Sequence, residues 1–345
     1  MKYIIVVIFC ILTCCSNDTS DISFQELESF TVSETSIPKD TIFIFDTIEP
    51  IDTFTLFDTI KIIDTIEAID TLKITKWKED FNKCKTVFDS AIVPQKALFW
   101  GNSLLGGFGQ FGMSASNDTL DYFAHIKHFF DEKNISFEAS KIAGNYENIQ
   151  NLQEKQLYIN DVIYPLISDS TNLVVIQLGD NVNEEQEFII FKDDIDFLLD
   201  HICGIAKNAK VLWIGEWYAS APKQKILKEE AEKFGVTFID ISDLNIPSNQ
   251  SYVGAIIDFP NISNFSMTYD SYIAKEDSLE ISFYYEDSLY TSTIKIENYS
   301  DDSLTKTISW EGNQFIVPNS GIATHPNDKA FKEIADRILI ALGYD

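Results

Sequence analysis

The chain has few cysteines and few histidines, and this shortage excludes several classes of protein. Its 345 residues include five cysteines and four histidines. Three of the cysteines lie in the first 15 residues, so only Cys84 and Cys203 remain beyond them, too few for a disulfide-rich scaffold. No histidine lies near a cysteine pair with the spacing of a zinc site. The fold must therefore depend on a hydrophobic core, and we expect no metal or other cofactor.

The two remaining cysteines lie far apart in the sequence, and both fall in segments with a helical pattern. Cys84 precedes the first predicted strand, and Cys203 lies in the long predicted helix that follows the third strand. They could pair in an oxidising compartment. We expect instead that both are buried free thiols.

Basic residues are also scarce. The chain has 26 lysines and arginines against 54 aspartates and glutamates, which gives a formal net charge of -28. Because phosphate groups would be repelled over most of the surface, nucleic acid is excluded as a partner. The same charge argues against docking on anionic lipid, so any attachment to a membrane must come from acyl chains.

The N-terminus has the pattern of a processing signal. A positively charged start is followed by the apolar run Tyr3 to Leu12, which is too short to span a bilayer as a mature helix. The run and the cysteines after it resemble a bacterial lipoprotein signal peptide, here residues 1–14, with Cys15 as the lipidated new N-terminus. Cys14 is the second candidate, and an ordinary secretory signal is the alternative. The resemblance implies a palmitate-type anchor on a protein that faces the periplasm or the cell exterior.

Residues 15–76 form a separate segment with an internal repeat. Its six-residue period does not match the 3.6 residues of a helical turn, whereas its many β-branched residues suit an extended chain. We therefore predict an extended stalk; a short β-solenoid is the alternative, but the turn residues it needs are absent. The Asp-Thr-apolar triplets also resemble an O-glycosylation signal of some Gram-negative secretory pathways, which predicts a glycoprotein. The repeated Asp-Thr pairs begin at Asp40, Asp46, Asp52, Asp58, Asp64 and Asp70.

From residue 77 to residue 345 the chain has the pattern of one α/β domain. Short apolar strands alternate with helices, which predicts a three-layer, flavodoxin-like parallel sheet covered on both faces. The pattern is interrupted at about residues 252–316 by short, aromatic, β-rich stretches, which we predict to be an insertion. The strands are predicted at 96–100, 135–142, 173–178, 211–214 and 237–241, and the helices at 118–132, 148–167, 184–208, 224–234 and 328–342.

Four short motifs mark a candidate site. Gly101-Asn102-Ser103-Leu104 follows the first strand, Gly144 follows the second, and Gly179-Asp180-Asn181 follows the third. His325 precedes the last helix. Open α/β sheets bind their ligands at the carboxyl ends of the strands, which is where three of the motifs lie.

The order of these motifs resembles the SGNH/GDSL hydrolase superfamily. Position by position, the resemblance implies a catalytic set of Ser103, Gly144, Asn181 and His325, and it covers about residues 95–245 and 318–343. Three positions depart from the family pattern: Asn102 and Val182 each replace an aspartate, and Ile322 stands three residues before the histidine, where the family has its orienting aspartate.

The chemistry that this set implies is that of a serine hydrolase. His325 would remove the proton of the Ser103 hydroxyl, since a histidine titrates close to neutral pH. The backbone N–H groups of Ser103 and Gly144 and the side-chain amide of Asn181 would stabilise the oxyanion. With Ile322 in place of aspartate, the imidazole must be oriented by another group. The candidates are a backbone carbonyl, Asp180 and Asp328.

The leading function is hydrolysis of an ester through an acyl-enzyme, with an acylated, in particular acetylated, glycan at the cell envelope as substrate. An envelope O-acetyltransferase is one alternative, because the same serine could pass an acyl group to a sugar hydroxyl. A non-catalytic glycan-binding surface lipoprotein is another, and Ile322 is the residue that favours it. Core packing is the favoured role of Trp217, and the rim of the site is the alternative for Trp217 and Tyr218. Packing is the favoured role of the aromatic residues in the insertion, notably Tyr269, Tyr272 and Trp310, with sugar stacking as the alternative.

Overall fold

The fold was analysed in a computed structural model that describes residues 84, 93–108, 111–144, 146–182 and 185–344. The predicted signal peptide, Cys15 and the stalk lie outside these residues. Within the described ranges, no helix combines the length and the apolar composition that a membrane crossing requires.

A five-stranded parallel sheet forms the centre of the α/β part. Its strand order is β2-β1-β3-β4-β5, the flavodoxin-like order, which confirms the predicted fold class. The strands are β1 (Lys96–Gly101), β2 (Glu138–Ala143), β3 (Leu173–Gln177), β4 (Lys210–Ile214) and β5 (Thr237–Ile239).

Successive side chains of the sheet enter two different hydrophobic clusters. On β1, Ala97 and Phe99 contribute to one cluster, and Leu98 and Trp100 to the other. This division follows from the two-residue period of a strand, which directs alternate side chains to opposite faces. Because both faces of the sheet are covered, every residue of β3 is buried, and all of them are apolar except Gln177.

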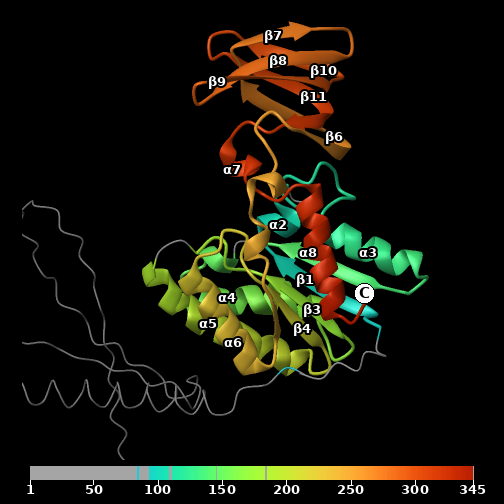
Figure 1. The fold of residues 1–345 in the computed structure, drawn as a ribbon, viewed down its shortest axis with the longest axis vertical. Helices are drawn as coiled ribbons and strands as arrows, with labels where there is room; N and C mark the ends of the chain where they lie inside the picture. The colour runs from blue at the N-terminus through green and yellow to red at the C-terminus, as the bar shows by residue number, and fades with distance from the viewer. Residues whose placement is uncertain (1–83, 85–92, 109–110, 145, 183–184, 345) are drawn as a thin grey trace, which may run out of the picture. The chain divides into compact units, whose positions relative to one another are not determined.

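Helices cover both faces of the sheet (Figure 1). Side chains of α3 (Tyr122–Glu132) and α8 (Asp328–Ala341) belong to the first cluster, whereas those of α5 (Glu185–Ile205) and α6 (Ala221–Phe234) belong to the second. The single helix predicted at 148–167 is instead α4 (Leu152–Tyr158), followed by a π-helical turn and a 3₁₀ turn that contains Pro165. Proline lacks the N–H that a continuing α-helix would need. The remaining short helices are α2 (Ser103–Gly106), η1 (Tyr146–Asn148), η2 (Ile159–Ile163), η3 (Tyr164–Leu166), η4 (Ser242–Leu244), η5 (Pro247–Asn249) and α7 (Ser320–Ala323).

The β-rich insertion contains two three-stranded antiparallel sheets, with orders β10-β11-β6 and β7-β8-β9. Apolar side chains from both sheets, among them Ile281, Ile308 and Trp310, share one buried core. Trp310 is 2 % exposed, so its role is packing and not sugar stacking. The strands are β6 (Ile256–Thr268), β7 (Ser271–Ala274), β8 (Ser278–Tyr285), β9 (Ser288–Lys295), β10 (Asn298–Asp302) and β11 (Thr307–Ile316).

The expectation of two free thiols is wrong. Cys84 and Cys203 form a disulfide across 119 residues of sequence. Cys84 lies outside any helix, and its N–H donates to the carbonyl oxygen of Phe234, so Cys84 contacts both α5 and α6. Distance along the sequence therefore gave no information about distance in the fold. By constraining the unfolded chain, a bridge over a loop of this length stabilises the fold, by about 2–5 kcal/mol in typical cases.

Candidate active site

The predicted motifs meet where the connections of the sheet change direction. Strand β1 lies between β2 and β3, so the chain leaves β1 on one side and returns to β3 on the other. In flavodoxin-like sheets this switch point forms a crevice at the carboxyl ends of the strands. Ser103 follows β1 there, and Asn181 follows β3.

Ser103 is the first residue of the short helix α2. Asn102 caps this helix, because its side-chain oxygen accepts a hydrogen bond from the N–H of Leu104 at 3.3 Å. The carbonyl oxygen of Ser103 accepts from the N–H groups of Gly107 and Met113, which fixes the turn on its other side. The half-buried serine thus presents its hydroxyl from a rigid strand-to-helix turn.

His325 reaches this serine across 222 residues of sequence. Its Nε2 lies 3.0 Å from the Ser103 Oγ, within hydrogen-bonding distance. The histidine lies in the turn between α7 and α8, where its backbone N–H donates to the carbonyl of Ile322 and its own carbonyl accepts from the N–H of Ser251. Ser103 and His325 therefore form a dyad with the geometry of a nucleophile and its base.

Burial keeps the imidazole of His325 uncharged near neutral pH. The residue is 7 % exposed, and desolvation lowers its pKa to about 4, although the backbone carbonyls of Ile322 and Gly321 act in the opposite direction. An unprotonated imidazole is the form that can accept a proton from serine.

No carboxylate contacts His325 among the residues that the structure describes, and both aspartates proposed from the sequence for this role have other partners. Asp180 accepts hydrogen bonds from the backbone N–H of Tyr218 at 2.8 Å and from the side chain of Gln177 at 2.7 Å. Asp328 accepts from the N–H and the hydroxyl of Ser116. The orienting group is therefore neither aspartate, whereas the third candidate, a backbone carbonyl, does interact with the imidazole, through Ile322 and Gly321.

The hydroxyl of Tyr218 is the polar side-chain group at the second nitrogen of the imidazole, 3.1 Å from Nδ1. The same hydroxyl lies 3.1 Å from the Thr324 Oγ1, which donates to the carbonyl oxygen of Ser320 at 2.8 Å. A carbonyl can only accept, and each hydroxyl has one proton to donate. Thr324 therefore accepts from Tyr218, and Tyr218 accepts from Nδ1–H. This chain of hydrogen bonds places the imidazole proton on Nδ1 and leaves Nε2 free to accept from Ser103.

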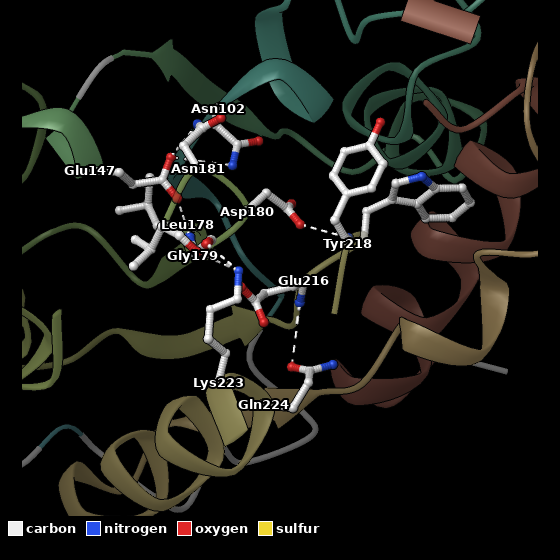
Figure 2. Close-up of polar contacts among 12 residues, drawn as sticks. Asn102, Glu147, Leu178, Gly179, Asp180, Asn181, Glu216, Tyr218, Lys223 and Gln224 are labelled. Atoms are coloured by element: carbon white, nitrogen blue, oxygen red, sulfur yellow. Dashed lines mark hydrogen bonds and ion pairs between the residues drawn. The ribbon is translucent and has the colours of Figure 1, made fainter. Parts of the chain in front are cut away.

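Asn181 lies at the turn after β3, and its side-chain amide donates to the carboxylate of Glu147 at 2.6 Å (Figure 2). The same carboxylate accepts from the side chain of Asn102, the residue before the nucleophile, at 3.4 Å. Through Glu147, the predicted oxyanion asparagine is thus connected to the nucleophile turn.

The predicted role of Gly144 as an oxyanion donor does not fit this geometry. Its backbone N–H donates to the carbonyl oxygen of Gly101 at 3.1 Å and so continues the parallel pairing of β1 with β2. A glycine does have a reason to be there: a Cβ at this position would collide with the hydroxyl of Tyr158, so a larger residue would require that side chain to move. Two of the three predicted donors remain, the N–H of Ser103 and the amide of Asn181.

Two charged groups below the turn after β3 were not predicted from the sequence. Lys223 on α6 donates to the carbonyl oxygens of Gly179 and Val182 and forms an ion pair with Glu216 (Figure 2). Burial raises the pKa of Glu216 to about 7 and that of Asp180 to about 6. Neither Glu216 nor Lys223 belongs to a recognisable motif, so no sequence signal pointed to them.

The described part of the chain contains no group of three or more His, Cys, Asp and Glu side chains that could hold a metal ion. Two carboxylates of the site, those of Glu147 and Asp180, instead accept hydrogen bonds from side-chain amides and backbone N–H groups.

No protein-family model matches this chain, and no curated protein sequence does. Several solved structures are similar to it. Among them are lipases and esterases. An acetyl xylan esterase from Butyrivibrio proteoclasticus is 12 % identical, covers 74 % of this chain and 66 % of its own, and has a TM-score of 0.36.

Two further matches cover less of this chain. An extracellular lipase from Streptomyces rimosus is 16 % identical over 44 % of this chain and 81 % of its own, with a TM-score of 0.29. A putative GDSL-like lipase from Parabacteroides merdae is 13 % identical, covers 44 % of this chain and 79 % of its own, and has a TM-score of 0.33. Likenesses this distant do not assign an activity.

The hydrogen-bond chain predicts a defined effect of changing Thr324. In Thr324→Val the Tyr218 hydroxyl loses its acceptor and turns to donate to Nδ1, which favours the imidazole tautomer that cannot accept from Ser103. We expect kcat for an ester substrate to fall about two- to tenfold, the effect of about one hydrogen bond. Steady-state kinetics of the purified variant measure this.

Thr324→Ser, which keeps the hydroxyl, should restore most of the lost turnover. The matched control is Thr293→Val on the exposed surface of β9, which makes the same chemical change far from the dyad in sequence. Parental kcat in Thr324→Val would show that the chain does not set the tautomer.

The lowered pKa of His325 predicts the pH dependence of the reaction. Protonation removes the acceptor on Nε2, so activity should be lost only as the pH falls through about 4. At pH values between about 4 and the usual histidine pKa of 6.5 the enzyme should keep most of its activity. The profile of kcat/KM between pH 3.5 and 8 measures this, with circular dichroism at each pH to confirm that the protein stays folded. An acid limb near pH 6.5 would contradict the desolvated imidazole.

Proposed function

We propose that this protein is a serine ester hydrolase that acts through an acyl-enzyme. The observation that carries the proposal is the contact of 3.0 Å between the Ser103 Oγ and the His325 Nε2, in which the hydrogen bonds at Nδ1 leave Nε2 as the acceptor. Without such a base, a serine hydroxyl is a weak nucleophile at neutral pH.

In the proposed acylation step, the Ser103 Oγ attacks the carbonyl carbon of the ester while its proton moves to the His325 Nε2. The carbonyl oxygen becomes an oxyanion, which the N–H of Ser103 and the side-chain amide of Asn181 stabilise. The intermediate then collapses: the bond from carbon to the leaving oxygen breaks, and the proton on Nε2 passes to the departing alcohol. The acyl group stays on Ser103.

In the proposed deacylation step, water takes the place of the alcohol. His325 accepts a proton from the water as its oxygen attacks the acyl-enzyme, and it returns the proton to Ser103 when the carboxylic acid leaves. While His325 is positively charged, the oxygen of Tyr218 stabilises the Nδ1–H. A neutral oxygen does this less strongly than a carboxylate, so we expect a slower enzyme than one with a complete triad.

We propose an acylated, in particular acetylated, glycan as the substrate class. The resemblance to anchored esterases of the SGNH/GDSL superfamily supports it. So does the ring of Tyr218, which is 37 % exposed beside His325 and offers a surface on which a sugar ring can pack. An O-acetyltransferase would use the same dyad but pass the acyl group to a sugar hydroxyl instead of water.

We also propose that the protein is lipid-anchored through Cys15 and faces the periplasm or the cell exterior. The apolar run Tyr3 to Leu12, which ends just before Cys14-Cys15, supports this location.

Ser103→Ala and His325→Ala should each abolish hydrolysis of a chromogenic acetate ester, because each removes one member of the dyad. Asn181→Ala should lower kcat about a hundredfold at a nearly unchanged KM, since an oxyanion donor acts chiefly in the transition state. Circular dichroism and thermal melting should show that all three variants are folded. Parental turnover in Ser103→Ala would exclude the proposed function.

The substrate class is tested by incubating the protein with acetylated xylan and with deacetylated xylan plus an acetyl donor. Free acetate that Ser103→Ala does not release supports the esterase. Acetylated acceptor without free acetate would instead identify an O-acetyltransferase.

The proposed anchor predicts that a palmitate analogue labels the protein in a bacterial host that carries out lipoprotein processing. The label should disappear in Cys15→Ser. A label kept in Cys15→Ser but lost in Cys14→Ser would move the lipid to Cys14, and an unlabelled parent protein would indicate an ordinary secretory signal.

A further inference from the structure

Glu147 is a buried carboxylate that contacts Asn102, the residue before the nucleophile, and that the proposed reaction does not use. It lies in η1, directly after the loop that follows β2, and is 7 % exposed. Among the described residues it forms no ion pair, and its hydrogen bonds all come from N–H groups of the two turns around the site. Burying an anion without a paired cation costs free energy unless hydrogen-bond donors surround it. The position of the Glu147 carboxylate therefore depends on these N–H groups, and the position of the N–H groups depends on the carboxylate.

Its two oxygens hold three parts of the site. One oxygen accepts from the backbone N–H of Gly179, and the other accepts from the Asn181 amide at 2.6 Å and, more weakly, from the Asn102 amide at 3.4 Å. The backbone of Asn181 also contributes a hydrogen bond. Figure 2 shows the carboxylate between Asn102 and the turn Gly179-Asp180-Asn181.

The turn that Glu147 holds has an unusual backbone. Gly179 has φ +133°, a conformation that glycine adopts readily but L-residues rarely do, so the turn requires a glycine at this position. Lys223 fixes the turn through the carbonyl oxygens of Gly179 and Val182, and Glu147 fixes it through N–H groups. Glu147 also binds the side-chain amide of Asn181 directly, so it controls the direction of that amide as well as the path of the backbone.

We infer that Glu147 is a positioning residue that orients the side-chain amide of Asn181 toward the oxyanion and ties it to the nucleophile turn through Asn102. This inference rests on the proposed function, in which Asn181 is an oxyanion donor. An amide N–H₂ has two protons, so one can stay on the carboxylate of Glu147 while the other points to the substrate. The carboxylate thereby fixes the rotation of the amide before substrate arrives, which is the preorganisation that oxyanion stabilisation requires.

The test is Glu147→Gln in the purified mature protein. The substitution keeps shape and volume but replaces one acceptor oxygen by an N–H₂ that faces other donors. We expect kcat for a chromogenic acetate ester to fall about tenfold to a hundredfold, with KM within about twofold of the parental value. The reason is that a misplaced Asn181 amide would weaken the stabilisation of the oxyanion, which forms only in the transition state. Glu230→Gln is the matched control: Glu230 is 6 % exposed and paired with lysines on α5 and α6, away from these turns. It should keep parental kcat.

A double-mutant cycle separates positioning from general destabilisation. If Glu147 acts through Asn181, Glu147→Gln should lower kcat by less than about twofold when Asn181 is already alanine. A full further loss in the double variant, or a parental kcat in Glu147→Gln alone, would overturn the inference.

The position of the amide can also be followed without activity. In protein labelled with ¹⁵N-asparagine, the side-chain signal absent from Asn181→Ala belongs to Asn181. Loss of the carboxylate should shift or broaden this signal in Glu147→Gln but not in Glu230→Gln. An unchanged signal would overturn the inference. If the parent protein hydrolyses no ester but the signal still shifts in Glu147→Gln, the proposed function is excluded while the contact between Glu147 and Asn181 stands.

Discussion

Strands β1 and β3 are neighbours in the sheet, although β2 lies between them in the sequence. Their pairing, Ala97 with Leu173 through Gly101 with Gln177, ends at the same level on both strands. The nucleophile turn and the turn that carries Asn181 therefore leave the sheet side by side. A shift in the register of this pair would separate Ser103 from Asn181 and would move the apolar side chains of β3 to the wrong faces.

The environment of His325 shows how an imidazole can be oriented without a carboxylate. Two hydroxyls and one backbone carbonyl define the direction of every proton between His325 and Ser320, since the carbonyl at the end can only accept. No charge faces Nδ1 in this arrangement. No neighbouring anion raises the pKa of the imidazole, and burial lowers it. The base therefore stays unprotonated over a wide pH range.

The negative charges of the site lie under the turns and not behind the histidine. Glu147, Asp180 and Glu216 are all buried. Desolvation is the largest cause of the raised pKa of Asp180 and of Glu216, repulsion from Glu147 adds to both, and repulsion from Asp180 adds to that of Glu216. One lysine, Lys223, offsets this charge, and backbone and side-chain N–H groups bind the rest. The turn that contains Gly179 is thus held by polar contacts on several sides.

The sequence alone was sufficient for the α/β class and for the approximate place of each strand of the parallel sheet. Its resemblance to the SGNH/GDSL pattern pointed to Ser103 and His325, which the structure brings within 3.0 Å of each other. Apolar periodicity and glycine-containing motifs at strand ends are local signals, and they remain readable in a single chain. The sequence also suggested Tyr218 as a residue at the rim of the site, but it gave no indication of the hydrogen bond between Tyr218 and His325.

Only the tertiary structure decided the remaining features. The direction of the Gly144 N–H depends on the pairing of β2 with β1, and the disulfide depends on how residues 119 apart meet. The contacts of Tyr218 with His325 and of Glu147 with Asn181 join residues 107 and 34 positions apart. Such contacts have no period and no motif, because they are set by which strands are neighbours and which side chains then share a buried space.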